Sequence, residues 1–205
     1  MSKQNLNSLT SLFAGKTSEP KDVKSGNSVD ATSGPVICGD LDIRIDRDAH
    51  WFYHGTPIGR KELVKLFSSV LQRDDDGSYW LVTPVEKGRI LVEDVPFAAV
   101  EMDVDGTGQE QKISFRTNVD EIVIAGKANP IRVDIDSETK EPSPYVLVRD
   151  GLEARLTRSV YYELVELGVE EEVDGALKYG IWSGGEFFVI GSLDEADDKS
   201  AGDAC

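Results

Sequence analysis

Three things are scarce in this sequence of 205 residues: long apolar runs, cysteines and positive charge. No run of about 18 apolar residues occurs, which excludes a membrane-spanning helix. The only cysteines are Cys38 and Cys205, so we predict no disulfide scaffold and expect a reducing compartment. The N-terminus also lacks the continuous apolar segment of a signal peptide. These absences together favour a cytoplasmic protein.

The shortage of positive charge limits the partners that the protein can bind. The chain has 22 basic and 38 acidic residues, a net charge of -16, and no cluster of Lys or Arg offsets that sign. Phosphate backbones and anionic membrane surfaces would therefore be repelled. We expect neither nucleic acid nor membrane as a partner.

Motifs that carry chemistry are also missing. No nucleophile elbow, P-loop or dinucleotide-binding glycine pattern is present. His50 and His54 are spaced four residues apart but bracket a strand-like segment, and no cluster completes a metal-ligand set. Asp103 and Asp105 resemble the start of a calcium loop, but its twelfth position would be Lys112, so a hairpin turn is favoured. We predict no catalytic residue, metal or cofactor.

Composition divides the chain into four parts. Residues 1–34 hold few aliphatic side chains and should form a disordered tail. An alternative is a short docking helix, because Leu6, Leu9, Leu12 and Phe13 fall at helical spacing. Residues 35–97 and 98–191 should form an N-terminal α+β domain and a C-terminal domain. Residues 192–205 should form a second, acidic disordered tail.

Hydrophobic periodicity places two helices among many short strands. Helices are predicted at 58–72, with Thr56 as its cap and Pro57 in its first turn, and at 156–167. Asp150-Gly151 should break the strand before the second helix. Alternating apolar residues predict strands at 41–45, 51–53, 79–82, 89–93, 97–104, 112–117, 121–125, 131–135, 145–148, 176–182 and 186–190.

The two helices belong to a weak internal repeat. His54-Gly55 precedes the first helix as Asp150-Gly151 precedes the second, and Arg60 and Arg158 open the helices. We therefore predict an internal duplication. The two halves would meet near residues 81–97. This segment contains two prolines, Pro84 and Pro96, and the polar or aromatic residues Thr83, Glu86, Glu93, Asp94 and Phe97.

Arginines are the candidate ligand-binding groups. A cation at a helix N-terminus opposes the helix dipole, so Arg60 and Arg158 make sense there if each meets a carboxylate or a phosphate. Arg149 and Arg155 lie close to the second helix in sequence. The alternative is a set of structural ion pairs with Glu86, Glu93, Asp94 or Glu153.

Several strings resemble a bacterial family that is known only as a domain of unknown function, number twelve eighty-five. The most specific are Thr83-Pro84-Val85-Glu86-Lys87, Glu93-Asp94-Val95-Pro96-Phe97 and Val148-Arg149-Asp150-Gly151-Leu152-Glu153-Ala154. One departure is Ala49-His50, where the family has Asp-Gly. The resemblance implies a two-domain α+β fold with an internal duplication, the second domain superficially like a pleckstrin-homology barrel. It also implies a ligand site at the domain interface, for a nucleotide-like molecule, and a role in signal transduction.

We therefore expect a non-catalytic module that binds a small, anionic, nucleotide-like ligand. The predicted ligand-binding residues are Arg60, Tyr79, Thr83, Glu86, Glu93, Asp94, Phe97, Arg149, Glu153 and Arg158. An alternative is a protein-interaction adaptor without a small-molecule ligand, which would expose an apolar patch. A hydrolase built on Glu86, Glu93 or Asp94 is disfavoured because no nucleophile accompanies them.

Overall fold

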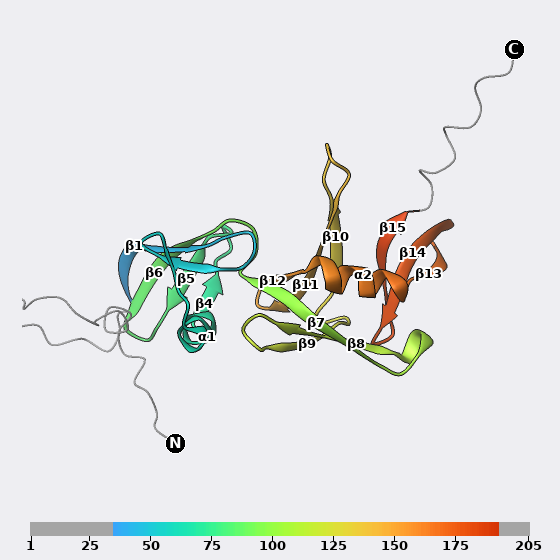
Figure 1. Cartoon of the computed structure of the whole chain (residues 1–205), viewed down its shortest axis with the longest axis horizontal. Helices are drawn as coiled ribbons and strands as arrows, with labels where there is room; N and C mark the ends of the chain where they lie inside the picture. Colours follow the sequence, from blue (N-terminus) through green and yellow to red (C-terminus); the bar gives the residue numbers. More distant parts are fainter. Residues whose placement is uncertain (1–34, 193–205) are drawn as a thin grey trace, which may run out of the picture. The chain divides into compact units, whose positions relative to one another are not determined.

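The computed structural model describes residues 35–192, which form two compact units (Figure 1). The first consists of residues 35–44 and Trp51–Leu91. The second consists of Ile45–His50 and residues 92–192. The predicted N-terminal tail, its alternative docking helix and all but the first residue of the predicted acidic tail lie outside the described residues.

The first unit is a six-stranded sheet with one helix. The strand order is β3-β2-β1-β6-β5-β4. Helix α1 packs on the sheet through Phe67, whose ring stacks on that of Trp51 in β2 with centroids 6.1 Å apart; both side chains are buried. The elements are β1 (Val36–Ile45), β2 (Trp51–Tyr53), β3 (Thr56–Pro57), α1 (Lys61–Ser69), β4 (Leu71–Arg73), β5 (Tyr79–Val82) and β6 (Glu86–Val92).

Helix α1 begins later than periodicity predicts. His54 and Gly55 both have positive φ, 47° and 74°, as the two-residue turn of a β-hairpin requires. That turn pairs Tyr53 with Thr56, so Thr56 and Pro57 form strand β3 instead of the helix cap and first turn. The cap position is Arg60, whose side chain makes no capping hydrogen bond.

Strand β6 also differs from the prediction, because it begins at Glu86 and the predicted strand begins at residue 89. The turn before it lies earlier, because the Thr83 hydroxyl accepts a hydrogen bond from the Glu86 amide at 3.0 Å. Gly88 is inside the strand, where a Cβ atom would lie only 2.5 Å from the Leu41 side chain. The glycine therefore serves close packing and not chain reversal.

The second unit contains two sheets and helix α2 (Arg158–Glu166). A six-stranded sheet has the order β10-β11-β12-β7-β8-β9, and a three-stranded sheet has the order β13-β14-β15. Strands β12 and β7 pair in parallel, and the other neighbouring strands of these two sheets pair antiparallel. The strands are β7 (Phe97–Asp105), β8 (Lys112–Thr117), β9 (Ile122–Ile124), β10 (Ile131–Ile135), β11 (Pro142–Arg149), β12 (Leu152–Leu156), β13 (Val169–Val173), β14 (Ala176–Ser183) and β15 (Glu186–Ser192), with a short 3-10 helix, η2 (Gly108–Glu110), between β7 and β8.

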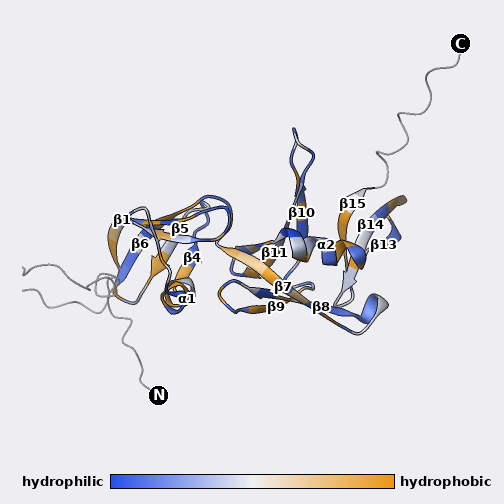
Figure 2. Ribbon diagram, in the orientation of Figure 1, coloured by the Kyte–Doolittle hydropathy of each residue, from blue (hydrophilic) through white to orange (hydrophobic). Residues whose placement is uncertain are grey.

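Alternating burial shows which face of the larger sheet forms the core. In β8 and β12 every second side chain is buried, and helix α2 contributes the fully buried Val160 and Leu164. Figure 2 shows β7 as apolar at its start, whereas the outer end of the β10–β11 hairpin is hydrophilic. The core therefore lies among β7, β8, β12 and α2.

Strand β12 is the main omission from the predicted elements of this unit. Asp150 and Gly151 have φ values of 43° and 74°, so they reverse the chain in a tight hairpin instead of ending the sheet. Residues 152–156 then return beside β11, with Tyr145 opposite Arg155. Helix α2 consequently begins at Arg158, two residues later than predicted.

The predicted two-domain organisation is confirmed, and the predicted α+β class fits only roughly, because the described chain is mostly β with few helices. Each unit holds one α-helix of nine residues. The predicted hairpin turn at Asp105-Gly106 joins the antiparallel strands β7 and β8 through η2. Within residues 35–192, no helix has the length and hydropathy needed to cross a membrane.

Candidate functional site

A cavity of about 850 Å³ lies in the second unit, and all of its lining residues belong to that unit. Its volume falls in the range of small-molecule sites. Six structural pieces form its wall: the first turns of α2, strand β7, the end of β12, the start of β11 with the residue before it, the turn after β8 and the loop Ile45–His50. The charged wall residues are Arg47, Asp48, His50, Glu141, Arg155 and Arg158.

Helix α2 contributes an open N-terminus to this wall. Thr157 occupies the cap position but makes no capping hydrogen bond with its side chain, and the first turn contains no acidic residue. The amide groups of that turn and the helix dipole both favour a negative charge there. Arg158 is the first helical residue, is exposed and lines the cavity.

The arginines of the cavity differ from the other arginines of the second unit. Arg116, Arg132 and Arg149 each pair with at least one carboxylate. Among residues 35–192, no carboxylate lies within ion-pair distance of Arg47 or Arg158.

Arg155 is intermediate, since its guanidinium lies 3.5 Å from Asp94 and 3.2 Å from the Ser143 hydroxyl. For Arg155 the predicted alternative of a structural ion pair therefore holds. Two unpaired guanidinium groups and one weakly paired group line the same cavity.

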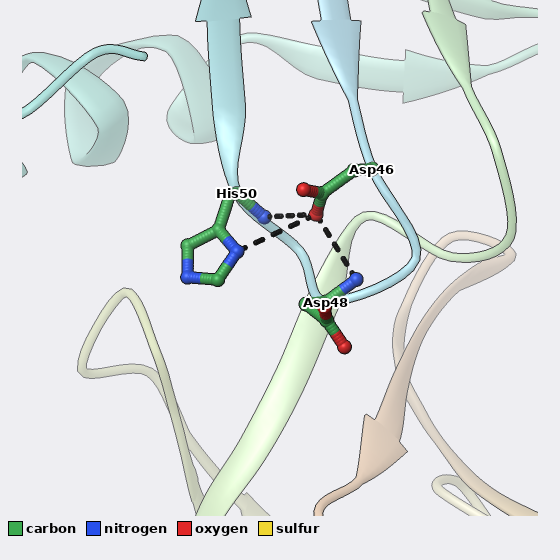
Figure 3. A group of neighbouring side chains, drawn as sticks. All are labelled: Asp46, Asp48 and His50. Carbon is green, nitrogen blue, oxygen red and sulfur yellow. Dashed lines mark hydrogen bonds and ion pairs between the residues drawn. The ribbon is translucent and has the colours of Figure 1, made fainter.

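The loop Ile45–His50 is shaped by Asp46 (Figure 3). One carboxylate oxygen of Asp46 accepts hydrogen bonds from the amides of Asp48 and His50, at 3.0 and 2.9 Å. The same oxygen lies 3.6 Å from Nδ1 of His50. These contacts fold residues 47–49 into a turn, and Arg47 and Asp48 of that turn line the cavity.

Asn118 fixes this loop against strand β7. Its side-chain amide donates to the Ala49 carbonyl at 3.1 Å, and its side-chain oxygen accepts from the Ala98 amide at 3.2 Å. Ala49 is buried with φ of 60°, a left-handed conformation that alanine rarely adopts. The surrounding contacts thus hold a strained turn that directs Arg47 and His50 to the cavity.

Two tyrosines and two carboxylates complete the chemistry of the wall. Burial raises the pKa of Tyr161, and the Tyr161 hydroxyl donates to the Ile190 carbonyl at 3.5 Å. Tyr162 is 60% exposed and offers an aromatic face. Asp48 and Glu141 oppose the three arginines, which leaves the wall cationic by one charge when His50 is neutral.

Asp46, Asp48 and His50 also bring three potential metal ligands within 4.8 Å of one another. The contacts of Asp46 give this group a structural role, because they close the loop (Figure 3). His54, the second histidine singled out in the sequence, pairs instead with Asp42 in the first unit, at 2.5 Å. His50 and His54 therefore lie beside different carboxylates, those of Asp46 and Asp42, and do not share one site.

Three of the predicted ligand-binding residues of the first unit, Tyr79, Thr83 and Glu86, have local structural partners. Thr83 is buried and closes the β5–β6 turn with the main chain of Glu86. The Tyr79 ring lies 5.7 Å from the Arg73 guanidinium. Arg60 is exposed at the cap of α1.

In the second unit only Arg158, of the predicted set, lines the cavity. Glu93 is exposed, and Asp94 accepts hydrogen bonds from the Tyr145 hydroxyl at 3.1 and 3.3 Å. Phe97 is fully buried beneath the Arg149 guanidinium, 5.2 Å from its ring centroid. Arg149 pairs with Glu121, and Glu153 with Arg132 at 2.7 and 2.8 Å.

Sequence reasoning missed most of the wall of this cavity. Arg47, His50, Asn118 and Tyr161 come from a loop, a turn and a helix far apart in the chain. One signal could have indicated Arg47: it lies between Asp46 and Asp48 in a turn, where an arginine has little structural purpose. No pattern in the sequence links that turn to Asn118.

Comparison with known proteins identifies similar sequences along nearly the whole described chain. Family models described as the N-terminal and C-terminal domains of DUF1285, both of unknown function, match residues 31–95 and 96–190. A crystal structure of a DUF1285 family protein from Silicibacter pomeroyi DSS-3 is 44% identical, covers 91% of this chain and 96% of its own, and gives a TM-score of 0.74. One from Shewanella baltica OS155 is 28% identical, with coverages of 62% and 91% and a TM-score of 0.48. No curated protein matches the chain.

Proposed function

The chain belongs to the DUF1285 family, as its sequence strings predict, and because that family's description names no activity we propose a function from the cavity itself. We propose that the protein is a cytoplasmic, non-catalytic module of signal transduction. Its second unit would bind a small, anionic, nucleotide-like molecule in the cavity beside α2.

The observation that carries this proposal is the lack of carboxylate partners around Arg47 and Arg158 in the described part of the chain. In a protein with a net charge of -16, an arginine has many carboxylates available. Two guanidinium groups that share one cavity and pair with none of them are suited to an external anion. A planar guanidinium binds phosphate oxygens through two parallel hydrogen bonds, which favours a phosphorylated ligand.

The remaining wall supports a ligand that also has a planar ring. The uncapped N-terminus of α2 can donate amide hydrogen bonds to phosphate oxygens. Tyr161 and Tyr162 add aromatic surface next to it, and the Glu141 carboxylate can accept hydrogen bonds from the polar edge of a base. The ligand site that the sequence predicts at the domain interface is a different site, because it would include Arg60, Tyr79, Thr83 and Glu86, and it stays a prediction.

A thermal-shift screen with nucleotides, dinucleotides and inorganic pyrophosphate tests the proposal. At a ligand concentration of 100 Kd the stabilisation is about 2.7 kcal/mol, which corresponds to a rise in Tm of roughly 5–10 °C for a chain of this size. Arg158→Gln and Arg47→Gln should each abolish most of that rise. Arg89→Gln removes an exposed guanidinium of the first unit and is the control. No rise with any of these compounds, or an undiminished rise in both cavity variants, would contradict the proposal.

An adaptor role is the second candidate, and an exposed apolar strand favours it. Strand β9 is the edge of the six-stranded sheet, and its Ile122 and Ile124 are 69% and 54% exposed. Edge strands with apolar side chains are sites of strand addition by partners. This role predicts that Ile122→Lys prevents recovery of a specific partner, while the ligand-induced change in Tm persists.

Two finer features of the fold also stay proposals. An internal duplication is supported by the recurrence, in each unit, of a hairpin turn with two positive φ values followed by a nine-residue helix. The likeness of the second unit to a pleckstrin-homology barrel rests on the family resemblance. Superposition of the two hairpin–helix pieces in an experimental structure would test the duplication.

A further inference from the structure

Most edge strands of this fold are protected from pairing with another chain. An edge strand presents unpaired N–H and C=O groups, and proteins blunt it with proline, charged side chains or a covering element. In the first unit, edge strand β3 contains Pro57 and edge strand β4 ends at the exposed Arg73. In the second unit, the edge strands β10 and β15 contact each other, and the edge strand β13 carries the exposed Glu170 and Glu172.

Strand β9 differs from these edge strands, because it contains neither proline nor a charged residue. Its Ile122 and Ile124 are 69% and 54% exposed, whereas Val123 between them is buried. The two isoleucines therefore lie together on the outer face of the six-stranded sheet. An exposed apolar edge is costly to a monomer, so this strand is suited to pairing with another strand.

The main chain of β9 also directs its free groups outward. The Ala125 amide donates to the Ile113 carbonyl, and the Thr117 amide donates to the Glu121 carbonyl, both at 2.8 Å. In an antiparallel pair, residues that bond the neighbouring strand alternate with residues whose N–H and C=O point away from it. The amide and carbonyl groups of the two isoleucines consequently point away from β8.

We propose that β9 pairs antiparallel with β9 of a second copy of this chain, so that two chains share one continuous sheet. A pair centred on Val123 places Ile122 of each copy opposite Ile124 of the other. The opposed isoleucines then pack on each other, and their outward main-chain groups form hydrogen bonds. A two-fold axis makes this contact self-complementary, as in most homodimers. The pairing does not depend on the proposed ligand.

Charges at the two ends of β9 favour a second copy as the occupant. Lys127 follows the strand, and no carboxylate of residues 35–192 lies within ion-pair distance of it. Asp120 precedes the strand and pairs with Arg116. The antiparallel arrangement brings Lys127 of each copy toward Asp120 of the other. Charges more than about 8 Å apart are largely screened at 0.15 M ionic strength, so the net charge of -16 opposes this contact only weakly.

Sedimentation velocity of the full chain tests the pairing. A contact of this small size is typical of transient association, so the protein concentration is varied from about 5 µM to about 0.5 mM. We expect a concentration-dependent dimer. The double variant Ile122→Lys, Ile124→Lys should raise its Kd about ten-fold or more, because like charges then meet across the contact.

The control is the double variant Leu91→Lys, Leu177→Lys, which makes the same change in net charge. These leucines are 60% and 46% exposed, but their strands, β6 and β14, lie inside their sheets. An undiminished dimer in the edge variant, or an equal loss in both variants, overturns the inference. A chain that stays monomeric over the whole range also overturns it, and would leave β9 to a different protein, as in the adaptor role.

Disulfide formation tests the register. Chains that carry Cys38→Ser and Cys205→Ser are given either Ile122→Cys or Ile124→Cys, and are oxidised mildly, separately and as a mixture. The proposed pair places position 122 opposite position 124 with about 5.5 Å between Cα atoms, whereas identical positions lie diagonally at about 7–8 Å, beyond disulfide reach. The mixture should therefore cross-link at least about five-fold faster than either variant alone. Equal rates overturn the two-fold pairing.

Discussion

Arg158 is unusual because its position gives it no structural benefit. It is exposed, lies at the positive end of the α2 dipole, and has no carboxylate partner in the described residues. Arg132 is the opposite case: it binds Glu153 through two hydrogen bonds, pairs with Asp134 and lies 4.1 Å from the centroid of the Tyr145 ring. The contacts of an arginine therefore distinguish the two roles: a structural arginine pairs with carboxylates of the protein, and an arginine suited to ligand binding does not.

This contrast predicts opposite effects on stability. Arg158→Gln removes a cation from a helix N-terminus, so the free energy of unfolding should rise by a few tenths of a kcal/mol or stay unchanged. Arg132→Gln should lower it by about 1 kcal/mol or more, since a bidentate ion pair and a cation–π contact are lost. Urea denaturation of both variants measures the difference. A loss of more than about 1 kcal/mol in Arg158→Gln would show a structural role that the contacts do not reveal.

Tyr145 should make stability depend on pH in the alkaline range. Burial raises its pKa above 10.0, and the nearby Asp94 carboxylate raises that pKa further. Above pH 10 the unfolded chain therefore releases the Tyr145 proton while the folded chain retains it, so the free energy of unfolding falls as pH rises. Tyr145→Phe should show a shallower decline between pH 10 and 11 than the unsubstituted protein. Parallel declines, measured by urea denaturation at each pH, would contradict this attribution.

At the scale of elements, Ser183 joins the two sheets of the second unit. It is fully buried, its hydroxyl accepts from the Ile113 amide at 2.9 Å, and it donates to the Ala125 carbonyl at 2.8 Å. Gln111 adds a bond from its side chain to the Trp182 carbonyl at 2.7 Å. The end of β14 is therefore held against β8 and the residue after β9 by polar contacts in a buried setting.

Ser183→Ala should consequently destabilise the protein more than a surface serine does. It leaves a buried amide and a buried carbonyl without partners, which costs about 1–3 kcal/mol. For a chain of this length that is a fall in Tm of several degrees. Ser114→Ala is the control, because the exposed Ser114 hydroxyl makes only a long bond of 3.4 Å to Asp103. Equal Tm values for the two variants would mean that water replaces the Ser183 hydroxyl.

The elements that the sequence predicts well are those with strict alternation. Strand β8 was predicted with the observed bounds at Lys112–Thr117, and β10 at Ile131–Ile135. The predicted bounds differ from the observed ones beside three glycines. At Gly55 and Gly151 the glycine is the second residue of a tight hairpin, and at Gly88 it accommodates Leu41. Distinguishing these roles requires knowledge of the partner strand, which a single segment does not contain.

The candidate site was less predictable than the fold for the same reason. Arg158 was identified because its cost at a helix N-terminus is a local property. The roles of Phe97 and Glu153 depend on tertiary partners: Phe97 is covered by Arg149, and Glu153 meets Arg132 from another strand. The residue types alone do not show which side chains pair with another part of the chain and which are available to a ligand.

At the scale of the whole molecule, the loop Ile45–His50 is the one segment that crosses the division between the units. The residues before and after this loop in the sequence belong to the first unit. The loop itself makes its contacts in the second unit. The Ala49 carbonyl binds Asn118, and the Ile45 carbonyl accepts from the Glu93 amide at 3.0 Å. The cavity therefore takes Arg47 and His50 from a part of the sequence that the N-terminal family model matches.

This arrangement predicts that the second unit binds poorly when it is expressed alone. A fragment of residues 92–192 retains Arg155, Arg158 and helix α2 but lacks the loop. We expect its circular dichroism spectrum to keep the strand signal, because the core among β7, β8 and α2 is intact. Its affinity for pyrophosphate should fall about ten-fold or more relative to the full chain, as loss of one charge-assisted contact costs about 1.5–3 kcal/mol.

The control is the full chain with Arg47→Gln and His50→Gln, which keeps the loop's main chain but removes its ring and guanidinium. If the side chains account for the loss, this variant and the fragment should have similar Kd values by calorimetric titration. A fragment that binds as tightly as the full chain would show that the loop is not part of the site. A fragment without strand signal would instead show that the bonds from Asn118 and Glu93 to the loop are needed for folding, which would contradict the expected independence of this core.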